Sequence, residues 1–188
     1  FTEIGQQTGL HFTHQERAFS DFQRQPLLPG KHSQLGGGMA WGDADGDGDE
    51  DIYVAAAAGQ SGALYLQKGK GRFVKDTTNH ALFDAHRGHE DMTPLWLDFD
   101  SDGDFDLFVA SGGVECNPGD PILFDRLYLN NGKGKFTQAS KEILPQKAIS
   151  SGPAAAADFD ADGDLDLFIG GRVVPGQYPV TPESRAVG

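Results

Sequence analysis

Fifteen aspartates in three short segments carry most of the recognisable chemistry of this sequence. Residues 43–51, 98–106 and 158–166 each have Asp at positions one, three, five, seven and nine and Gly at position six. Acidic side chains at alternate positions of a curling loop point inward together, and Ca²⁺ takes six to eight oxygen ligands from such loops. The pattern therefore predicts three calcium-binding loops.

Each position of the pattern has an expected role. Positions one, three and five supply carboxylates, the glycine permits a sharp bend, position seven offers its backbone carbonyl, and position nine closes the cage as a bidentate carboxylate. The predicted ligands are Asp43, Asp45, Asp47, Asp49 and Asp51, then Asp98, Asp100, Asp102, Asp104 and Asp106, then Asp158, Asp160, Asp162, Asp164 and Asp166. Solvated turns also favour Asp and Gly, but three copies with identical acidic positions favour metal. Magnesium fits less well, because it keeps its waters and seldom takes an all-protein cage.

The loops differ from EF-hands in what surrounds them. An EF-hand needs Glu at loop position twelve and a helix on each side. Position twelve is Val54, Val109 and Ile169, each at the end of a β-branched and aromatic run typical of a buried strand. We therefore expect a strand, loop, strand arrangement.

The loops recur at intervals of 55 and 60 residues, which suits a unit of about four strands. Small residues in the strand before each loop suit positions where sheets converge on an axis. Further strands are expected at 63–66 and 126–129, each followed by a glycine-rich hairpin turn. The prediction is an all-β fold of β-propeller blades with about four antiparallel strands each, the calcium loop joining the first and second strands.

The repeat also predicts the domain organisation. Residues 1–10 resemble the segment that begins at Phe73 and are expected to be the last strand of a split blade, followed by a connecting loop at 11–35. The expected blades are 36–82, then 83–145 with an insertion at 112–123, then the start of a third at 146–188. This is an incomplete propeller, either part of a longer protein or completed by other chains. The two non-repeating segments are the expected places for a ligand.

Composition excludes several classes of function. The chain has 28 Asp and Glu against 15 Lys and Arg, a net charge of −13 that disfavours nucleic acid as a partner. The loops hold 16 of the 28 acids, so three Ca²⁺ would bring the net charge to −7. The longest small apolar run, 54–58, is far short of the ~20 residues that span a bilayer, so no transmembrane segment is expected.

The remaining reactive residues do not form a catalytic pattern. The single cysteine, Cys116, cannot form an internal disulfide and is expected to be an incidental thiol rather than a nucleophile or an intermolecular bridge. The pairs His11 with His14 and His86 with His89 do not match the H-E-x-x-H zinc motif and are expected to be surface or packing residues.

The loop pattern, followed by L-Y-L-N-N-G-K-G-K-F at 127–136, resembles the FG-GAP/VCBS repeat of integrin-α-type β-propellers. Segments such as His89-Glu90-Asp91 and 170–176 are similar to bacterial VCBS proteins that often carry an ASPIC/UnbV domain, which is not visible here. The resemblance implies calcium at positions one, three, five, seven and nine of each loop. It also implies a secreted bacterial protein, located outside the cell or in its envelope.

Three functions remain open at this point. The first is a non-enzymatic, calcium-stabilised extracellular propeller module for adhesion, scaffolding or recognition of a protein or carbohydrate partner. The second is a homo-oligomer, a head-to-tail filament or sheath subunit in which blades are completed between chains. The third is the propeller part of a secreted enzyme that acts on polysaccharides, an expectation by analogy alone.

Overall fold

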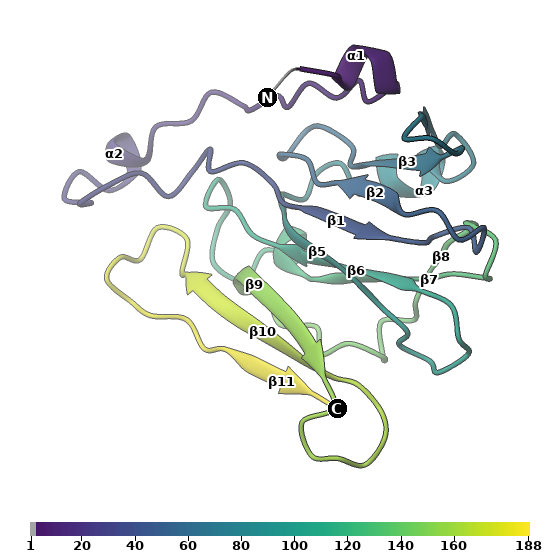
Figure 1. Ribbon diagram of the computed structural model, residues 1–188. Coiled ribbons are helices and arrows are strands. Elements are labelled where there is room, and N and C mark those ends of the chain that lie inside the picture. Colours follow the sequence, from purple (N-terminus) through teal and green to yellow (C-terminus); the bar gives the residue numbers. More distant parts are fainter. Residues whose placement is uncertain (1–2) are drawn as a thin grey trace.

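The computed structural model describes residues 3–188, which form three antiparallel sheets (Figure 1). The first sheet has the order β1-β2-β3-β4 and the second the order β5-β6-β7-β8, whereas the third has three strands, β9-β10-β11, with β10 in the middle. The strands are β1 (Met39–Gly42), β2 (Asp51–Val54), β3 (Ala63–Gln67), β4 (Phe73–Lys75), β5 (Asp91–Leu97), β6 (Asp106–Ser111), β7 (Arg126–Leu129), β8 (Thr137–Gln138), β9 (Ser150–Ala157), β10 (Asp166–Val173) and β11 (Arg185–Val187). This is the predicted all-β arrangement of incomplete, propeller-like blades.

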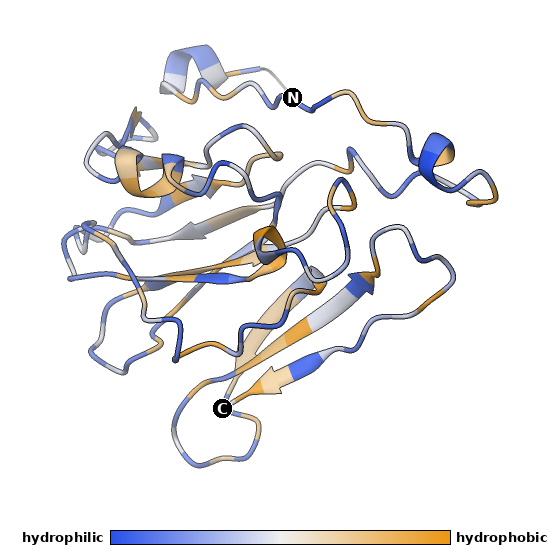
Figure 2. Cartoon of the chain, turned by 180° about the vertical axis from the view of Figure 1, so that it is seen from behind, coloured by the Kyte–Doolittle hydropathy of each residue, from blue (hydrophilic) through white to orange (hydrophobic). Residues whose placement is uncertain are grey.

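Helices are short and lie outside the sheets. They are α1 (Gly5–Thr8), α2 (Asp21–Arg24), α3 (His80–Asp84) and the 3₁₀ turn η1 (Pro121–Leu123). Figure 2 shows that hydrophobic residues concentrate on the strands, whereas most of the connecting loops are hydrophilic.

The first strands of the sheets pack against one another in turn, β1 on β5 and β5 on β9. Gly42 shows why small residues are needed there, because a Cβ at this position would lie 2.8 Å from the Trp96 ring. Such a contact would force the strands apart.

The hydrophobic core lies between successive sheets. Tyr53 and Leu64 of the first sheet pack with Trp96 and Tyr128 of the second. A further set, which lies between the second and third sheets, comprises Leu97, Phe108, Ala110, Leu127, Leu144, Leu167 and Ile169. Burial against the next sheet thus holds the blades in sequence.

The N-terminal prediction is not met in the described residues. Phe1 and Thr2 of the expected strand 1–10 lie outside the described part, and the residues that follow form α1 and a turn. Gly9 ends this helix in the left-handed conformation (φ 87°) and donates its N–H to the Gly5 carbonyl at 3.0 Å. This local hydrogen bonding competes with strand formation. Leu10 still packs against the first sheet, beside Ile52 and Tyr65.

Residues 11–35 form an ordered crossing segment along the side of the sheets away from the aspartate loops (Figure 1). Tyr65 Oη of the first sheet donates to the His11 carbonyl at 2.5 Å, and Arg24 Nη1 donates to the Val114 carbonyl of the second unit at 2.8 Å. Arg172 Nη1 of the third sheet donates to the His32 carbonyl at 2.9 Å. The crossing segment therefore contacts all three units.

Candidate metal centres

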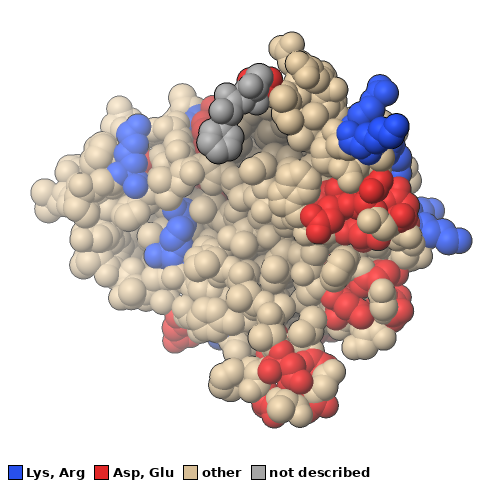
Figure 3. Space-filling view, in the orientation of Figure 1, with Lys and Arg blue, Asp and Glu red and all other residues tan. Residues whose placement is uncertain are grey.

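The three aspartate loops occupy equivalent places in the fold. Each one joins the first strand of a sheet to the second, β1 to β2, β5 to β6 and β9 to β10. Figure 3 shows three separate acidic patches along one side of the molecule. The loops are therefore repeated elements at the same ends of three blades.

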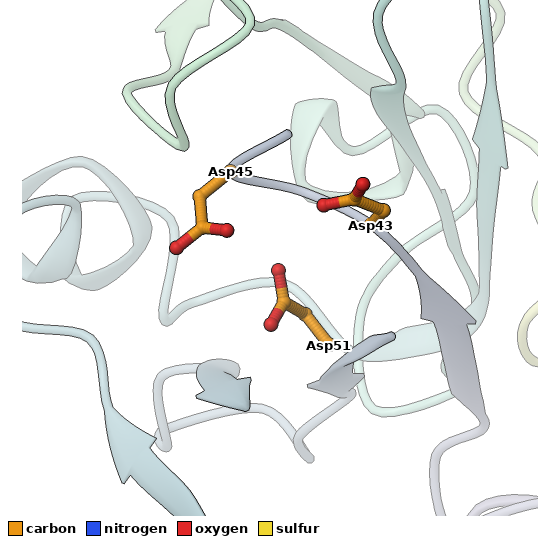
Figure 4. A group of neighbouring side chains, drawn as sticks. All are labelled: Asp43, Asp45 and Asp51. Atoms are coloured by element: carbon orange, nitrogen blue, oxygen red, sulfur yellow. The ribbon is translucent and has the colours of Figure 1, made fainter. Parts of the chain in front are cut away.

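Carboxylate oxygens gather in every loop. Ligand atoms within 4.8 Å of one another come from Asp43, Asp45 and Asp51, from Asp98, Asp100 and Asp102, and from Asp158, Asp160 and Asp166. In the first loop the three side chains face a common centre (Figure 4). The structure thus brings together positions one, three and nine in two loops, and positions one, three and five in the second.

The sixth position has the bend that the sequence predicts. Gly48, Gly103 and Gly163 have φ of 90°, 93° and 101°, a region that L-residues avoid. The fourth position is also left-handed, at Gly46, Ser101 and Ala161, with φ of 73°, 60° and 63°. Residue type does not reveal this second bend, because two of its three residues are not glycine.

The first aspartate organises the backbone of its own loop. Asp43 Oδ1 accepts from Gly46 N at 2.8 Å, and its Oδ2 accepts from Gly48 N at 2.9 Å. Gly103 N and Gly163 N donate in the same way to Asp98 and Asp158. These bonds curl the loop so that its carboxylates converge.

The ninth aspartate anchors the loop to the sheet. Asp51 and Asp106 are 0% and 1% exposed. Asp51 Oδ2 accepts from Ala44 N at 2.9 Å and its Oδ1 from Gln67 N at 2.7 Å, and Asp106 accepts in the same way from Phe99 N and Asn130 N. Burial raises the pKa of both carboxyl groups to about 6 despite these hydrogen bonds.

The aspartates at loop position seven lie outside the three clusters of carboxylate oxygens. The side chains of Asp49, Asp104 and Asp164 do not belong to them, and the backbone N–H of each donates to the fifth aspartate of its loop. A role for their backbone carbonyls stays a prediction.

Lys68 is a partner of the first loop that the sequence pattern did not reveal. Its Nζ lies 2.5 Å from Asp45 Oδ2 and 3.5 Å from Asp47 Oδ2. The hydrogen bond to Asp45 is the main reason that the pKa of Lys68 is raised. Asn131 takes the equivalent hairpin position in the second sheet. The lysine therefore places a cation where a metal ion would otherwise balance these carboxylates.

The donor set fits calcium. The gathered atoms are all carboxylate oxygens, the hard ligands that Ca²⁺ prefers. Asp45 Oδ1 is buried without a hydrogen-bond partner, which is costly for a carboxylate unless a cation satisfies it. In the part of the chain that the structure describes, groups of three or more potential metal ligands occur in these loops alone.

The other reactive residues lie elsewhere. Cys116 is buried, and burial raises the pKa of its thiol to about 11, which disfavours the reactive thiolate at neutral pH. His86 and His89 lie with ring centroids 5.7 Å apart. Burial, followed by the charge of Arg126, lowers the pKa of both, to about 3 for His89.

The family of this chain follows from fold, loops and sequence together. The family model described as "FG-GAP-like repeat" matches residues 43–109 and 98–169. The chain belongs to the FG-GAP-like repeat family. Repeats of this family generally form non-enzymatic structural or adhesion modules, are typically extracellular and often bind calcium.

No curated protein matches the chain. Within residues 3–188, none of the helices has the length and apolar character needed to cross a membrane.

Proposed function

We propose that the chain is a calcium-stabilised extracellular module for adhesion, scaffolding or recognition. The observation that carries this proposal is the repeated cage, in which three loops place aspartate oxygens within 4.8 Å of one another around the same glycine bend. Carboxylates this close repel one another, so a bound dication stabilises the folded loops. The ligands in our proposal are the odd-numbered positions of each loop.

The role of calcium in this proposal is structural. The loops join neighbouring strands at the ends of the blades, where ordering them fixes the β1–β2, β5–β6 and β9–β10 connections. Ca²⁺ supplies charge neutralisation and oxygen coordination when bound. The blade surfaces then provide a rigid platform for a protein or carbohydrate partner, and the function requires no catalytic step.

The test is thermal unfolding in chelator and in millimolar calcium, the range in which extracellular modules bind. A site contributes about 1.4 kcal/mol when free calcium is about ten times its Kd, so several occupied loops should raise the Tm by several degrees. Replacing Asp45, Asp100 and Asp160 together by Asn should abolish the shift. Asp84→Asn, outside the loops, should keep it, and a wild-type Tm that does not respond to calcium would refute the proposal.

Self-assembly is a second candidate function, supported by the outer face of the third sheet. Phe168 is 51% exposed, although Tyr53 and Phe108 at the equivalent register positions are 1% and 0% exposed. This face of β10 has the character of a blade-packing surface, which a second copy of the chain could cover.

A further inference from the structure

The hairpin that follows β7 links the first two aspartate loops. It belongs to the second sheet, yet it packs against the loop of the first: a Cβ at Gly46 would lie 2.9 Å from the Gly132 carbonyl oxygen, and one at Gly134 would lie 3.0 Å from Asp45 Cβ. Ala44, in the middle of this contact, is 0% exposed. The first loop is therefore covered by an element of the next blade.

Asn130, at the base of this hairpin, contacts both loops. Its Nδ2 donates to the Ala44 carbonyl of the first loop at 2.9 Å and to the Phe105 carbonyl of the second at 3.0 Å. Its Oδ1 accepts from Asn131 N at 2.9 Å, which fixes the orientation of the amide. Both donor hydrogens of the side chain are thus available to the two loops.

These bonds join the ninth aspartates of the two loops in one path. Ala44 N donates to Asp51 Oδ2 at 2.9 Å, and the Ala44 carbonyl accepts from Asn130 Nδ2. The backbone N–H of Asn130 then donates to Asp106 Oδ1 at 2.8 Å. In the proposed function the ninth aspartate of each loop is a calcium ligand, so this path connects the two sites.

We propose that Asn130 couples the first two calcium loops, so that calcium bound at one strengthens binding at the other. This inference rests on the proposed function, because it requires both loops to bind calcium. The loop that binds first fixes Asn130 and the hairpin, so the second binding event has less disorder to remove. Direct repulsion between two bound dications opposes this effect, and 0.15 M salt, with a Debye length of about 8 Å, weakens the repulsion between exposed charges.

Gln67 provides a matched control. It holds the equivalent position in the first sheet, where its backbone N–H donates to Asp51 Oδ1 at 2.7 Å as that of Asn130 does to Asp106. Within residues 3–188 its side chain makes no hydrogen bond to a loop, in contrast to that of Asn130. Gln67→Ala should therefore leave the coupling intact.

The experiment is a calcium titration of the full chain by calorimetry at 0.15 M salt, with Asp160→Asn and Asp162→Asn removing the third loop throughout. The calcium affinity of the second loop is measured in four chains. The first loop is either intact or disabled by Asp45→Asn and Asp47→Asn together, and each of these two forms is made with Asn130 and with Asn130→Ala. With Asn130, disabling the first loop should weaken the second by at least about five-fold. In the Asn130→Ala background the difference should fall below about two-fold. Asn130→Leu, which keeps the branching and the number of heavy atoms of the side chain, serves if the alanine variant does not fold.

Two results overturn the inference: a second loop that binds equally well whether or not the first is intact, or coupling that persists after Asn130 is replaced. A wild-type chain that binds no calcium would instead refute the proposed function. The two failures are distinguishable in the same titration.

Discussion

At the scale of single residues, Lys68 sets the balance between an internal and an external cation in the first loop. Its ion pairs with Asp45 and Asp47 compete with calcium for the negative charge of these two carboxylates. Lys68 is 45% exposed, so the pair is screened, and exposed pairs of this kind are worth about 1 kcal/mol or less. Lys68→Asn, which copies Asn131 of the second sheet, should therefore raise calcium affinity of the first loop by about two- to five-fold.

Calorimetry of chains with the first loop as the sole intact site measures this change. Lys70→Asn, on the same hairpin turn but without a loop ion pair in the described structure, is the control and should have little effect. An unchanged or weakened affinity in Lys68→Asn would show that the lysine does not compete with calcium.

Glu90 predicts a pH dependence on the side opposite the loops. It is 6% exposed, and burial, with the charges of Glu16 and Glu115, raises its pKa to about 7, although Arg172 and His14 oppose the shift. A raised carboxyl pKa means that the folded state holds the proton more tightly than the unfolded state. The favourable contribution of protonated Glu90 to the free energy of unfolding is therefore complete below about pH 4.5 and is lost as the pH rises to about 7.

Glu90→Gln should remove this loss. At pH 8 the variant should be more stable than the wild type by up to about 3 kcal/mol, and near pH 4.5 the two should be equal. Urea unfolding at both pH values in saturating calcium measures the difference, and Glu183→Gln, on an exposed side chain, is the control. A larger advantage at low pH than at high pH would contradict the assignment.

At the scale of elements, buried Asp–Arg pairs lie where neighbouring blades meet. Asp91 of β5 pairs with Arg126 of β7 at 2.5 Å, with side chains 5% and 4% exposed, and Asp91 N donates to the Ala56 carbonyl of the first unit. Asp125 pairs with Arg185 of β11, and accepts from Ser151 Oγ of β9 at 3.1 Å. The Asp91–Arg126 pair thus lies within the second sheet, at the place where Asp91 contacts the first unit, whereas the Asp125–Arg185 pair joins the second and third units.

Asp91→Ala should cost about 3–5 kcal/mol, because it leaves the Arg126 guanidinium buried without its counter-charge. Chemical unfolding in saturating calcium measures this loss. Asp84→Ala, which removes a pair with Arg87 that is 3.8 Å long and exposed, should cost less than about 1 kcal/mol. Equal effects of the two substitutions would mean that the buried pair contributes no more to stability than the exposed one.

The sequence predicted elements well where a local pattern determines them. The loop aspartates, their sixth-position glycines and the flanking strands 52–54, 107–109 and 167–169 all follow from spacing and residue type. The Asp91–Arg126 pair and the contacts of Asn130 could not be predicted in this way. Their partners lie 35 and 86 residues apart. Asp91 and Arg126 meet because β5 and β7 belong to one sheet, and Asn130 meets Ala44 because neighbouring blades pack together. The helix at Gly5–Thr8 is not predicted, because the whole of residues 1–10 is expected to be a strand, whereas the segment that they resemble is a strand at Phe73–Lys75 alone and continues into α3.

At the scale of the whole molecule, the three aspartate loops differ in how far neighbouring parts of the chain cover them. The residue at the second position of the aspartate loop is 0% exposed at Ala44, intermediate at Phe99 and 90% exposed at Phe159. The hairpin of the second blade covers the first loop, whereas no described residue covers Phe159 to this extent. Packing of each blade on the next therefore protects both the sheet face and the loop of the preceding one.

The exposed face of the third sheet should drive association between copies of the chain. Phe168 repeats the position of Tyr53 and Phe108, both of which are buried against the next sheet, and large apolar side chains exposed in this way favour contact with a further blade. Sedimentation velocity over a concentration series should show reversible self-association in calcium. Phe168→Ser should weaken it strongly, whereas Leu27→Ser, on a side chain that is 93% exposed in the crossing segment, should not. A wild-type chain that stays monomeric at concentrations up to about 1 mM would have a Kd of self-association weaker than millimolar. Copies of this chain would then not cover the face.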